Sequence, residues 1–399
     1  MVVGGAKPMT TRRFPPPWSV ENVVGCSVAE GKPMKRRHAG PRSKRIRDKR
    51  RSHLSAEQQP RGPLAARVQQ PSMPAAGLQL EKQLRDARSA EIQRRQIANK
   101  LEVQRNRSGA KRRTVRGAAP PAMPLHFLAV GDSWFDYPLD DYGNPANNQA
   151  IIGNGILGHT QLQSMGNPPP NILSLAYHGL SATAMLTYER QHEILDALKD
   201  PSQWNNGVTA DGILVSAGGD DVVGDSFAIY LGYKRGGLDA VRFQGILDSV
   251  QASYLDLFAL RDIAAAEVNI DPKQMPIFGH CYDYAIPNGA PAGHDGWKSG
   301  PWLKPSLKFA GYDYNEGLNI VQTTIDTFKQ KLLELANDKI VPPGKTTNNF
   351  ILIDTTTTLT RNDKLPNGWA NELHPYTEGF TLLAAKFLAA LQTHYPGRI

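Results

Sequence analysis

The sequence predicts an α/β fold in which a five-stranded parallel sheet lies between two layers of helices, preceded by a basic N-terminal segment. Short apolar runs alternate with longer amphipathic stretches from residue 121 to residue 399, which is typical of strands and helices in turn. A chain of 399 residues with 40% hydrophobic side chains can also bury a core of this size. We therefore expect one three-layer α/β/α domain over residues 121–399.

The five apolar runs are the predicted strands, and the amphipathic stretches that follow are the predicted helices. The strands are residues 125–130, 172–177, 212–217, 276–279 and 350–354. The helices are residues 184–198, 239–267, 316–337 and 378–393. A doubly wound sheet of this kind binds its ligands at the carboxyl ends of the strands, so functional residues are expected there.

Residues 1–120 differ from the rest of the chain in charge. They hold 28 Lys and Arg against 8 Asp and Glu, while the remaining 279 residues hold 18 against 29. Pro, Gly, Ser and the like-charged run 35–51 predict a largely disordered arm. Leucine, glutamine, arginine and alanine in residues 78–104 predict a solvated basic helix that Gly109 and residues 116–121 interrupt.

Several roles for this basic arm remain open. Residues 32–116 could contact nucleic acid through counterion release, or an anionic membrane surface, or they could be a solvated tail. They contain no aromatic residues, so the stacking platforms of single-strand binders are missing. Alternatively, Met123 is the true start of the chain and the arm is not translated.

Composition limits the class of protein further. The two cysteines are too few for a disulfide framework. The sequence contains no run of 18 apolar residues and no apolar leader, so we expect neither a membrane-spanning helix nor export. We expect a soluble, cytoplasmic protein whose oligomeric state stays open. Because His178, His280 and His294 lack the spacing of metal ligands, we predict no metal and no other cofactor.

Four groups of polar and small residues follow the predicted strands or precede the last helix. They are Gly131-Asp132-Ser133, Tyr177-His178-Gly179, Gly218-Gly219-Asp220-Asp221 and Asn371-Glu372-Leu373-His374. Each group alone occurs in many proteins. Together and in this order they place a serine, a glycine, an acidic residue and a histidine at one edge of the predicted sheet.

This constellation resembles the SGNH (GDSL-type) hydrolase family over about residues 123–395. The resemblance implies a flavodoxin-like fold and hydrolysis of an ester through an acyl-serine intermediate. Ser133 would be the nucleophile and His374 its general base, with Asn371 behind the imidazole. The backbone N–H groups of Ser133 and Gly179, together with Asp220, would form the oxyanion hole. The substrate would be a small-molecule, lipid or carbohydrate ester.

Two residues depart from the family pattern. Asp220 stands where the family has an asparagine, and an ionised carboxylate cannot donate a hydrogen bond. Asn371 stands where the family has an aspartate, and Glu372 or Asp363 could substitute for it. These departures keep a catalytically weak binding protein open as an alternative to an esterase.

Further residues are expected around the site. We interpret Asp132 as a buried structural carboxylate, and residues 285–305 could form a lid rich in Gly and Pro. Residues that could line a pocket are Asp132, Trp134, Asp221, Tyr282, Asp283 and Glu372.

Overall fold

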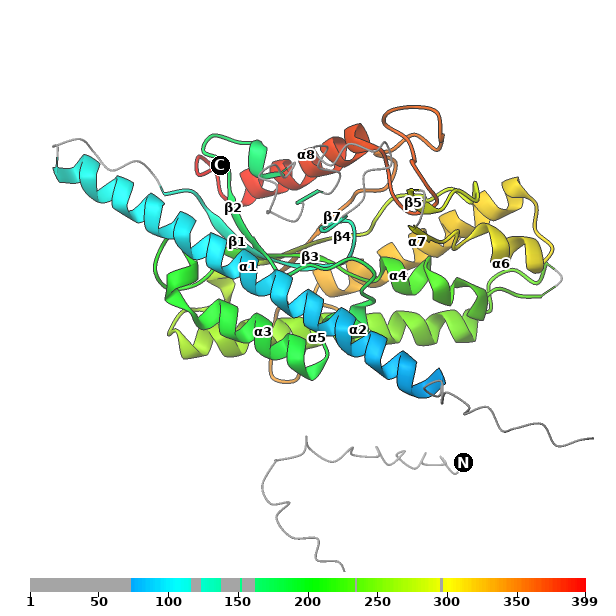
Figure 1. Cartoon of the computed structure of the whole chain (residues 1–399), viewed down its shortest axis with the longest axis horizontal. Coiled ribbons are helices and arrows are strands. Elements are labelled where there is room, and N and C mark those ends of the chain that lie inside the picture. Colours follow the sequence, from blue (N-terminus) through cyan, green and yellow to red (C-terminus); the bar gives the residue numbers. More distant parts are fainter. Residues whose placement is uncertain (1–72, 116–122, 138–150, 153–161, 234, 295–296) are drawn as a thin grey trace, which may run out of the picture. The chain divides into compact units, whose positions relative to one another are not determined.

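The structure, a computed structural model, describes residues 73–115, 123–137, 151–152, 162–233, 235–294 and 297–399. Residues Gln70–Ile399 form one compact unit (Figure 1). The predicted disorder of the arm and its charged run 35–51 lie outside the described residues.

A five-stranded parallel sheet forms the centre of this unit, in the order β2-β1-β3-β4-β7. Its strands are β1 (His126–Gly131), β2 (Asn171–Ser174), β3 (Gly212–Ser216), β4 (Ile277–His280) and β7 (Phe350–Ile353). Every residue of β1 and β3 is buried, because these strands have neighbours on both sides and helices on both faces. The predicted α/β fold class and its five strands are confirmed.

Helices cover both faces of the sheet. Figure 1 shows α8 (Thr377–His394) on one face and α3 (Tyr188–Lys199) with α5 (Ala240–Glu267) on the other. The helix α7 (Tyr314–Ala336) packs against α5 and β7. Its first turn is fixed by a capping box, in which Asp313 and Glu316 each accept a backbone N–H of the other.

Shorter elements make up the loops at the carboxyl edge of the sheet. They are α2 (Ala182–Met185), α4 (Gly219–Val222), α6 (Lys304–Phe309) and the antiparallel pair β5 (Ala292–His294) and β6 (Trp297–Ser299). Single 3₁₀ turns are η1 (Leu162–Ser164), η2 (Pro201–Gln203), η3 (Asp225–Ile229) and η4 (Pro272–Gln274).

The helix predicted over residues 184–198 is divided in the structure. The Ser181 hydroxyl accepts the backbone N–H of Ala184 and starts α2, whereas Thr187 in extended backbone precedes α3. Leu186 (φ −118°, ψ 29°) and Thr187 (φ −61°, ψ 158°) both leave the helical conformation, so the first helix ends before the second begins. The prediction of one continuous helix was wrong at this point.

The N-terminal helix α1 (Met73–Val115) includes the helix predicted over residues 78–104 and continues through Gly109. A single glycine costs a helix about 1 kcal/mol and does not end it when good helix formers flank it. Ile92, Arg95, Asn99 and Val103 are buried on one face of α1, which contacts β2 and η2. The predicted solvated helix is therefore a packed one.

No helix among the described residues is long and apolar enough to cross a membrane.

Candidate active site

Ser133 lies in the turn that directly follows β1. The turn passes so close to β3 that a Cβ on Gly131 would come within 2.6 Å of the Ser216 carbonyl oxygen, so only glycine fits at this position. The backbone N–H of Asp132 donates to this same carbonyl at 3.1 Å. The turn thereby holds Ser133 at the carboxyl end of the sheet, with 8% of its surface exposed.

The structure brings His374 to this serine. Ser133 Oγ lies 2.7 Å from His374 Nε2, although 241 residues separate them in the sequence. Burial lowers the pKa of His374 to about 3, and the charge of His178 adds to this effect. The imidazole is therefore neutral at pH 7 and can accept the serine proton.

Asn371 fixes the tautomer of this imidazole. Its Oδ1 accepts the backbone N–H groups of Leu373 and His374, each at 3.0 Å, so this atom must be the amide oxygen. The same oxygen lies 3.0 Å from His374 Nδ1, which must then carry the proton. Nε2 is left as the acceptor that faces Ser133. The Asn371 amide nitrogen donates to Tyr137 Oη at 3.0 Å, and the Tyr137 ring stacks on the imidazole.

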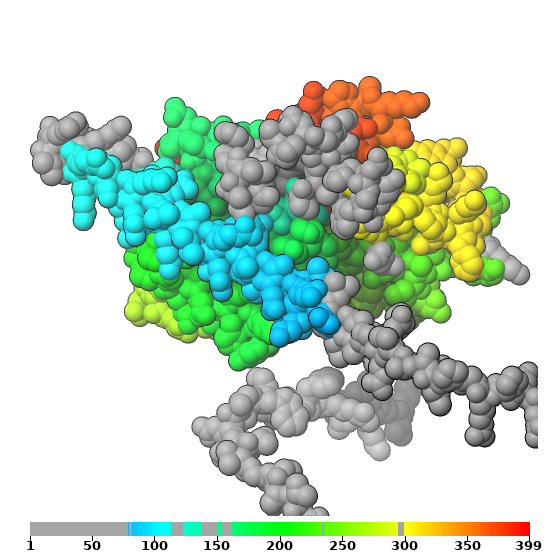
Figure 2. All heavy atoms as spheres, in the orientation of Figure 1, coloured from blue at the N-terminus to red at the C-terminus, as the bar shows by residue number. Residues whose placement is uncertain are grey.

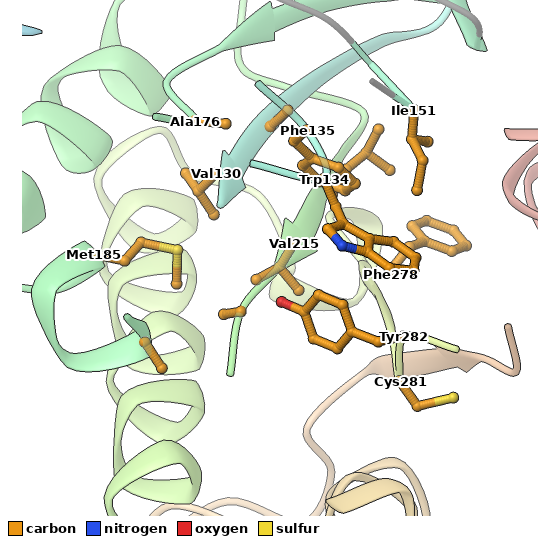
Figure 3. Close-up of a cluster of buried hydrophobic side chains, with 14 of the residues drawn as sticks. Val130, Trp134, Phe135, Ile151, Ala176, Met185, Val215, Phe278, Cys281 and Tyr282 are labelled. Atoms are coloured by element: carbon orange, nitrogen blue, oxygen red, sulfur yellow. The ribbon is translucent and has the colours of Figure 1, made fainter. Parts of the chain in front are cut away.

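Trp134 links the turn that carries Ser133 to the loop that carries His374. Its indole Nε1 donates to the Leu373 carbonyl at 3.0 Å, one residue before His374. The indole also stacks on His280 and meets the Tyr282 ring edge-on, at centroid distances of 5.3 and 5.0 Å. Figure 3 shows Trp134 and Tyr282 side by side at the end of the sheet. The distance between Ser133 and His374 is thus fixed by a side chain from the same turn.

Asp132 is a buried carboxylate that holds the turn in place through its hydrogen bonds. It accepts hydrogen bonds from the Trp134 backbone N–H, the Ser216 hydroxyl and the Tyr282 hydroxyl. Burial raises the pKa of Asp132 to about 6 despite these donors. Its three hydrogen-bond donors belong to the turn and to the neighbouring strands, as the interpretation of Asp132 as a structural carboxylate expects.

His280 continues this buried network. The Tyr282 backbone N–H donates to His280 Nδ1 at 3.2 Å, so the proton is on Nε2, which lies 2.9 Å from Ser216 Oγ. Burial lowers the pKa of His280 to about 3. Within the described part of the chain, no three His, Cys, Asp or Glu residues are grouped to hold a metal ion.

Gly179 and the acidic pair lie opposite His374. Gly179 has φ = 72°, which favours glycine, and a Cβ there would meet no atom within 4 Å. Asp221 is buried, and its carboxylate accepts the Ala182 backbone N–H at 2.7 Å, which ties the Gly179 loop to α4. Asp220, its neighbour, faces the cavity beside Ser133.

A cavity of about 340 Å³ opens at this point and is large enough for a small ligand. Ser133, Gly179, Asp220 and His374 all line it, so the structure brings the four sequence-predicted groups together. Its remaining wall is formed mainly by small and aromatic residues: Tyr137, Ser181, Ala184, Gly224, Ser226, Ala292, Ser299 and Trp302. A second, smaller cavity of about 20 Å³ lies between Ser133, Tyr282 and Trp369.

Two carboxylates expected near the site hold loops in place, and one of them, Asp283, also lines the smaller cavity with Ser133 and His374. Glu372 accepts backbone N–H groups from Gly289, Trp302, Leu303 and Lys304. Asp283 accepts those of Tyr284, Thr357 and Leu359. Glu372 therefore anchors the Gly/Pro-rich segment 285–305 and does not replace the missing aspartate. The Asp363 carboxylate contacts the Asn288 amide at 3.4 Å.

Sequence reasoning missed two residues next to the site, Asp136 and Arg95 of α1. Asp136 lies 3.4 Å from His178 and 2.8 Å from Arg95. The sequence held one signal for Asp136, an acidic residue three positions after the serine. It held none for Arg95, which is one of many arginines in its segment.

No protein-family model matches the chain, and no curated protein matches it by sequence. Among solved structures it is similar to the lipase Lip_vut3 from a goat rumen metagenome, with 14% identity, a TM-score of 0.37 and coverage of 67% of this chain and 97% of that one. It is also similar to phospholipase A1 from Streptomyces albidoflavus NA297, with 13% identity, a TM-score of 0.37 and coverage of 66% and 99%.

A third similar structure is a carbohydrate esterase family 3 protein from Talaromyces cellulolyticus, with 12% identity, a TM-score of 0.31 and coverage of 68% of this chain and 97% of that one. Likeness at these values carries no argument about chemistry. The function of this chain has to be derived from its own residues.

Proposed function

We propose that this chain is an SGNH-type serine acylhydrolase that cleaves an ester through an acyl-Ser133 intermediate. The observation that supports it most is the 2.7 Å distance between Ser133 Oγ and His374 Nε2. A neutral imidazole that holds its own proton on Nδ1 can take the hydroxyl proton as the oxygen attacks an ester carbonyl. The cavity of about 340 Å³ leaves room for that ester.

The reaction then runs in two halves. Ser133 Oγ bonds to the carbonyl carbon, and the carbonyl oxygen becomes an anion beside the Ser133 and Gly179 backbone. When the intermediate collapses, His374 returns the proton to the leaving alcohol. Water then attacks the acyl-serine, with His374 again accepting and returning a proton. The oxyanion donors contribute about 3 kcal/mol each in related chemistry.

Asp220 fits this reaction only as a neutral acid or through its backbone. An ionised carboxylate beside Ser133 would repel the developing anion. This residue and the uncharged Asn371 favour an enzyme of moderate rate. They also motivate the second candidate, a binding protein that uses the same cavity without turnover.

Labelling with a fluorophosphonate probe separates the two candidates. The wild-type protein is expected to react at Ser133, and Ser133→Ala is expected to lose both labelling and at least about 10³-fold of its p-nitrophenyl ester hydrolysis. Ser226→Ala is the matched control because it removes a hydroxyl from the same cavity wall. A folded wild-type protein that neither reacts with the probe nor cleaves any ester from acetate to palmitate would leave only the binding role.

Contact of residues 32–116 with nucleic acid or an anionic membrane remains a separate proposal. It requires binding to DNA or acidic vesicles that weakens steeply between low and high salt.

A further inference from the structure

The helix α1 docks on the rest of the unit with buried polar side chains. Arg95 is 6% exposed and forms an ion pair with Asp136, in which Arg95 Nη2 lies 2.8 Å from Asp136 Oδ1. Its other terminal nitrogen, Nη1, donates to the Ala176 carbonyl at 2.8 Å. A planar guanidinium can hold two acceptors at fixed positions in this way, which a lysine cannot do.

Both acceptors belong to loops that form the candidate active site. Asp136 comes three residues after Ser133, and its backbone N–H donates to the Asp132 carbonyl at 3.0 Å within the nucleophile turn. Ala176 comes three residues before Gly179, on the loop that follows β2. One side chain of α1 therefore joins the nucleophile turn to the loop of the oxyanion glycine.

A second contact strengthens this connection. The other carboxylate oxygen of Asp136, Oδ2, lies 3.4 Å from His178 Nδ1. His178 directly precedes Gly179 and lines the same cavity as Ser133 and His374. Side-chain contacts therefore connect α1 to the cavity wall in two steps, from Arg95 to Asp136 at 2.8 Å and from Asp136 to His178 at 3.4 Å.

The other polar contacts of α1 lead elsewhere. Asn99 donates to Gln203 of η2 and contacts His126 at the start of β1, and Arg107 donates to the carbonyls of Pro201 and Trp204 next to η2. These residues hold the helix without touching the two active-site loops. Figure 2 shows α1, coloured from blue to cyan, lying along the surface of the green segments that include α3.

We propose that Arg95 is a positioning residue for ester hydrolysis, which keeps the Ser133 turn and the Gly179 loop at their working separation. The helix α1 is then part of the hydrolytic unit, and its docking sets the geometry of the oxyanion hole. This inference rests on the proposed esterase activity. A displacement of about 1 Å between reacting groups can lower a rate by about 10²-fold.

The test compares Arg95→Met with Arg107→Met in the full chain. We expect Arg95→Met to lower kcat for p-nitrophenyl acetate by about 10- to 100-fold with a smaller change in KM. Arg107→Met removes a comparable docking contact, and we expect it to leave kcat within about twofold. Equal kcat values for the two folded variants would overturn the proposal.

Arg95→Met also leaves Asp136 without its ion-pair partner and could unfold. The double variant Arg95→Met/Asp136→Asn removes both charges and is expected to regain stability while kcat stays low, because the Ala176 carbonyl and His178 still lack their support. Full recovery of kcat in the double variant would show that the uncompensated charge, and not the lost positioning, caused the defect.

Hydrogen exchange gives a readout that does not depend on activity. Peptides that cover residues 131–137 and 175–186 are expected to exchange faster in Arg95→Met than in Arg107→Met. If wild type proves inactive but this difference appears, the esterase proposal fails, and Arg95 keeps only the structural role of holding the two loops together. If wild type is active and the exchange of both peptides is unchanged, the positioning role fails alone.

Discussion

Asn371 differs from the aspartate of the SGNH pattern in charge, but it orients the imidazole in the same way. Two backbone N–H groups fix its oxygen toward His374 Nδ1, and Tyr137 accepts from its nitrogen. In serine proteases an asparagine at the corresponding position costs about 10⁴ in rate, mainly because the wrong tautomer forms. Here Asn371 holds His374 in the tautomer that carries its proton on Nδ1, so only the negative charge of the aspartate is missing.

Replacing Asn371 by aspartate is expected to raise kcat/KM at pH 8 by about tenfold. The carboxylate would stabilise the imidazolium that forms during the reaction, and Tyr137 can rotate its hydroxyl to donate to it. The same charge raises the pKa of His374 above its value of about 3. The acid limb of the kcat profile should therefore move to higher pH, as p-nitrophenyl acetate hydrolysis from pH 4 to 9 would show. Asn371→Leu serves as the control and should lose activity at every pH.

Asp220→Asn tests the second departure from the family pattern. An amide can donate to the oxyanion whatever the pH, so activity is expected to stay the same or to rise. The measurement is kcat/KM of purified wild type and variant at pH 7. A loss of more than about tenfold would contradict this expectation and give the carboxylate a role of its own.

At this scale the sequence predicted Ser133 and His374, which lie within hydrogen-bond distance of each other, but not the residues that support them. Ser133 follows the first apolar run, and His374 precedes the last amphipathic stretch. The fold class alone therefore places both residues at the same edge of the sheet. The choice between Asn371, Glu372 and Asp363 depends on where each side chain points. That is decided by the backbone N–H groups around Glu372, which no local pattern reveals.

Among the elements, α1 connects the basic segment to the rest of the unit. Its buried face carries Ile92, Arg95, Asn99 and Val103, and Asn99 Oδ1 lies 2.8 Å from Nε2 of His126 at the start of β1. Composition suggested a solvated helix because charged residues surround these four positions. The spacing of the four is helical, but two of them are polar, so hydrophobic periodicity alone could not detect the packed face.

Removing residues 1–122 is expected to destabilise the protein by about 3–5 kcal/mol. The truncated chain would begin at Met123 and leave buried Asp136 without Arg95, which is the costly way to break a buried ion pair. Urea unfolding measures the difference. A chain of residues 73–399 is the control, since it keeps α1 and should match the full-length protein. A 123–399 chain as stable as this control would indicate that α1 contributes nothing to folding.

The strands were predictable and the helix boundaries less so. Each of the five apolar runs became a strand within a few residues, because β-branched and aromatic residues in short buried runs have few alternatives in an α/β chain. The division between α2 and α3 lies at Leu186 and Thr187, whose backbones leave the helical conformation. Nothing in the amphipathic pattern of residues 184–198 marks this break.

For the whole molecule, three buried histidines predict sensitivity to acid. Burial lowers the pKa of His126, His280 and His374 to about 3, whereas the unfolded chain titrates near 6.5. Between these values the unfolded state binds more protons, so stability falls as pH falls. Asp132 acts in the opposite direction, because its pKa is raised to about 6 and the folded state protonates first.

Three histidines opposed by Asp132 alone would lower the unfolding free energy by about 4 kcal/mol between pH 7 and pH 5. Burial also raises the pKa of Asp211, Asp221, Asp283 and Glu372, which makes the loss smaller than this. Urea unfolding at pH 7, 6 and 5 measures it. His280→Gln should reduce the pH slope by about one proton, whereas His192→Gln, on the exposed side of α3, should leave it unchanged. A free energy that stays constant over this range would contradict the prediction.

The helix α1 contacts β2, the outermost strand on one side of the sheet. The strand β2 is the last of the sheet on its side, and the outermost strand of any sheet carries backbone groups that can pair with a strand from another molecule. Proteolytic clipping ahead of Met123 would uncover this strand. We therefore expect clipped chains to self-associate as their concentration rises, while chains that keep the helix stay apart.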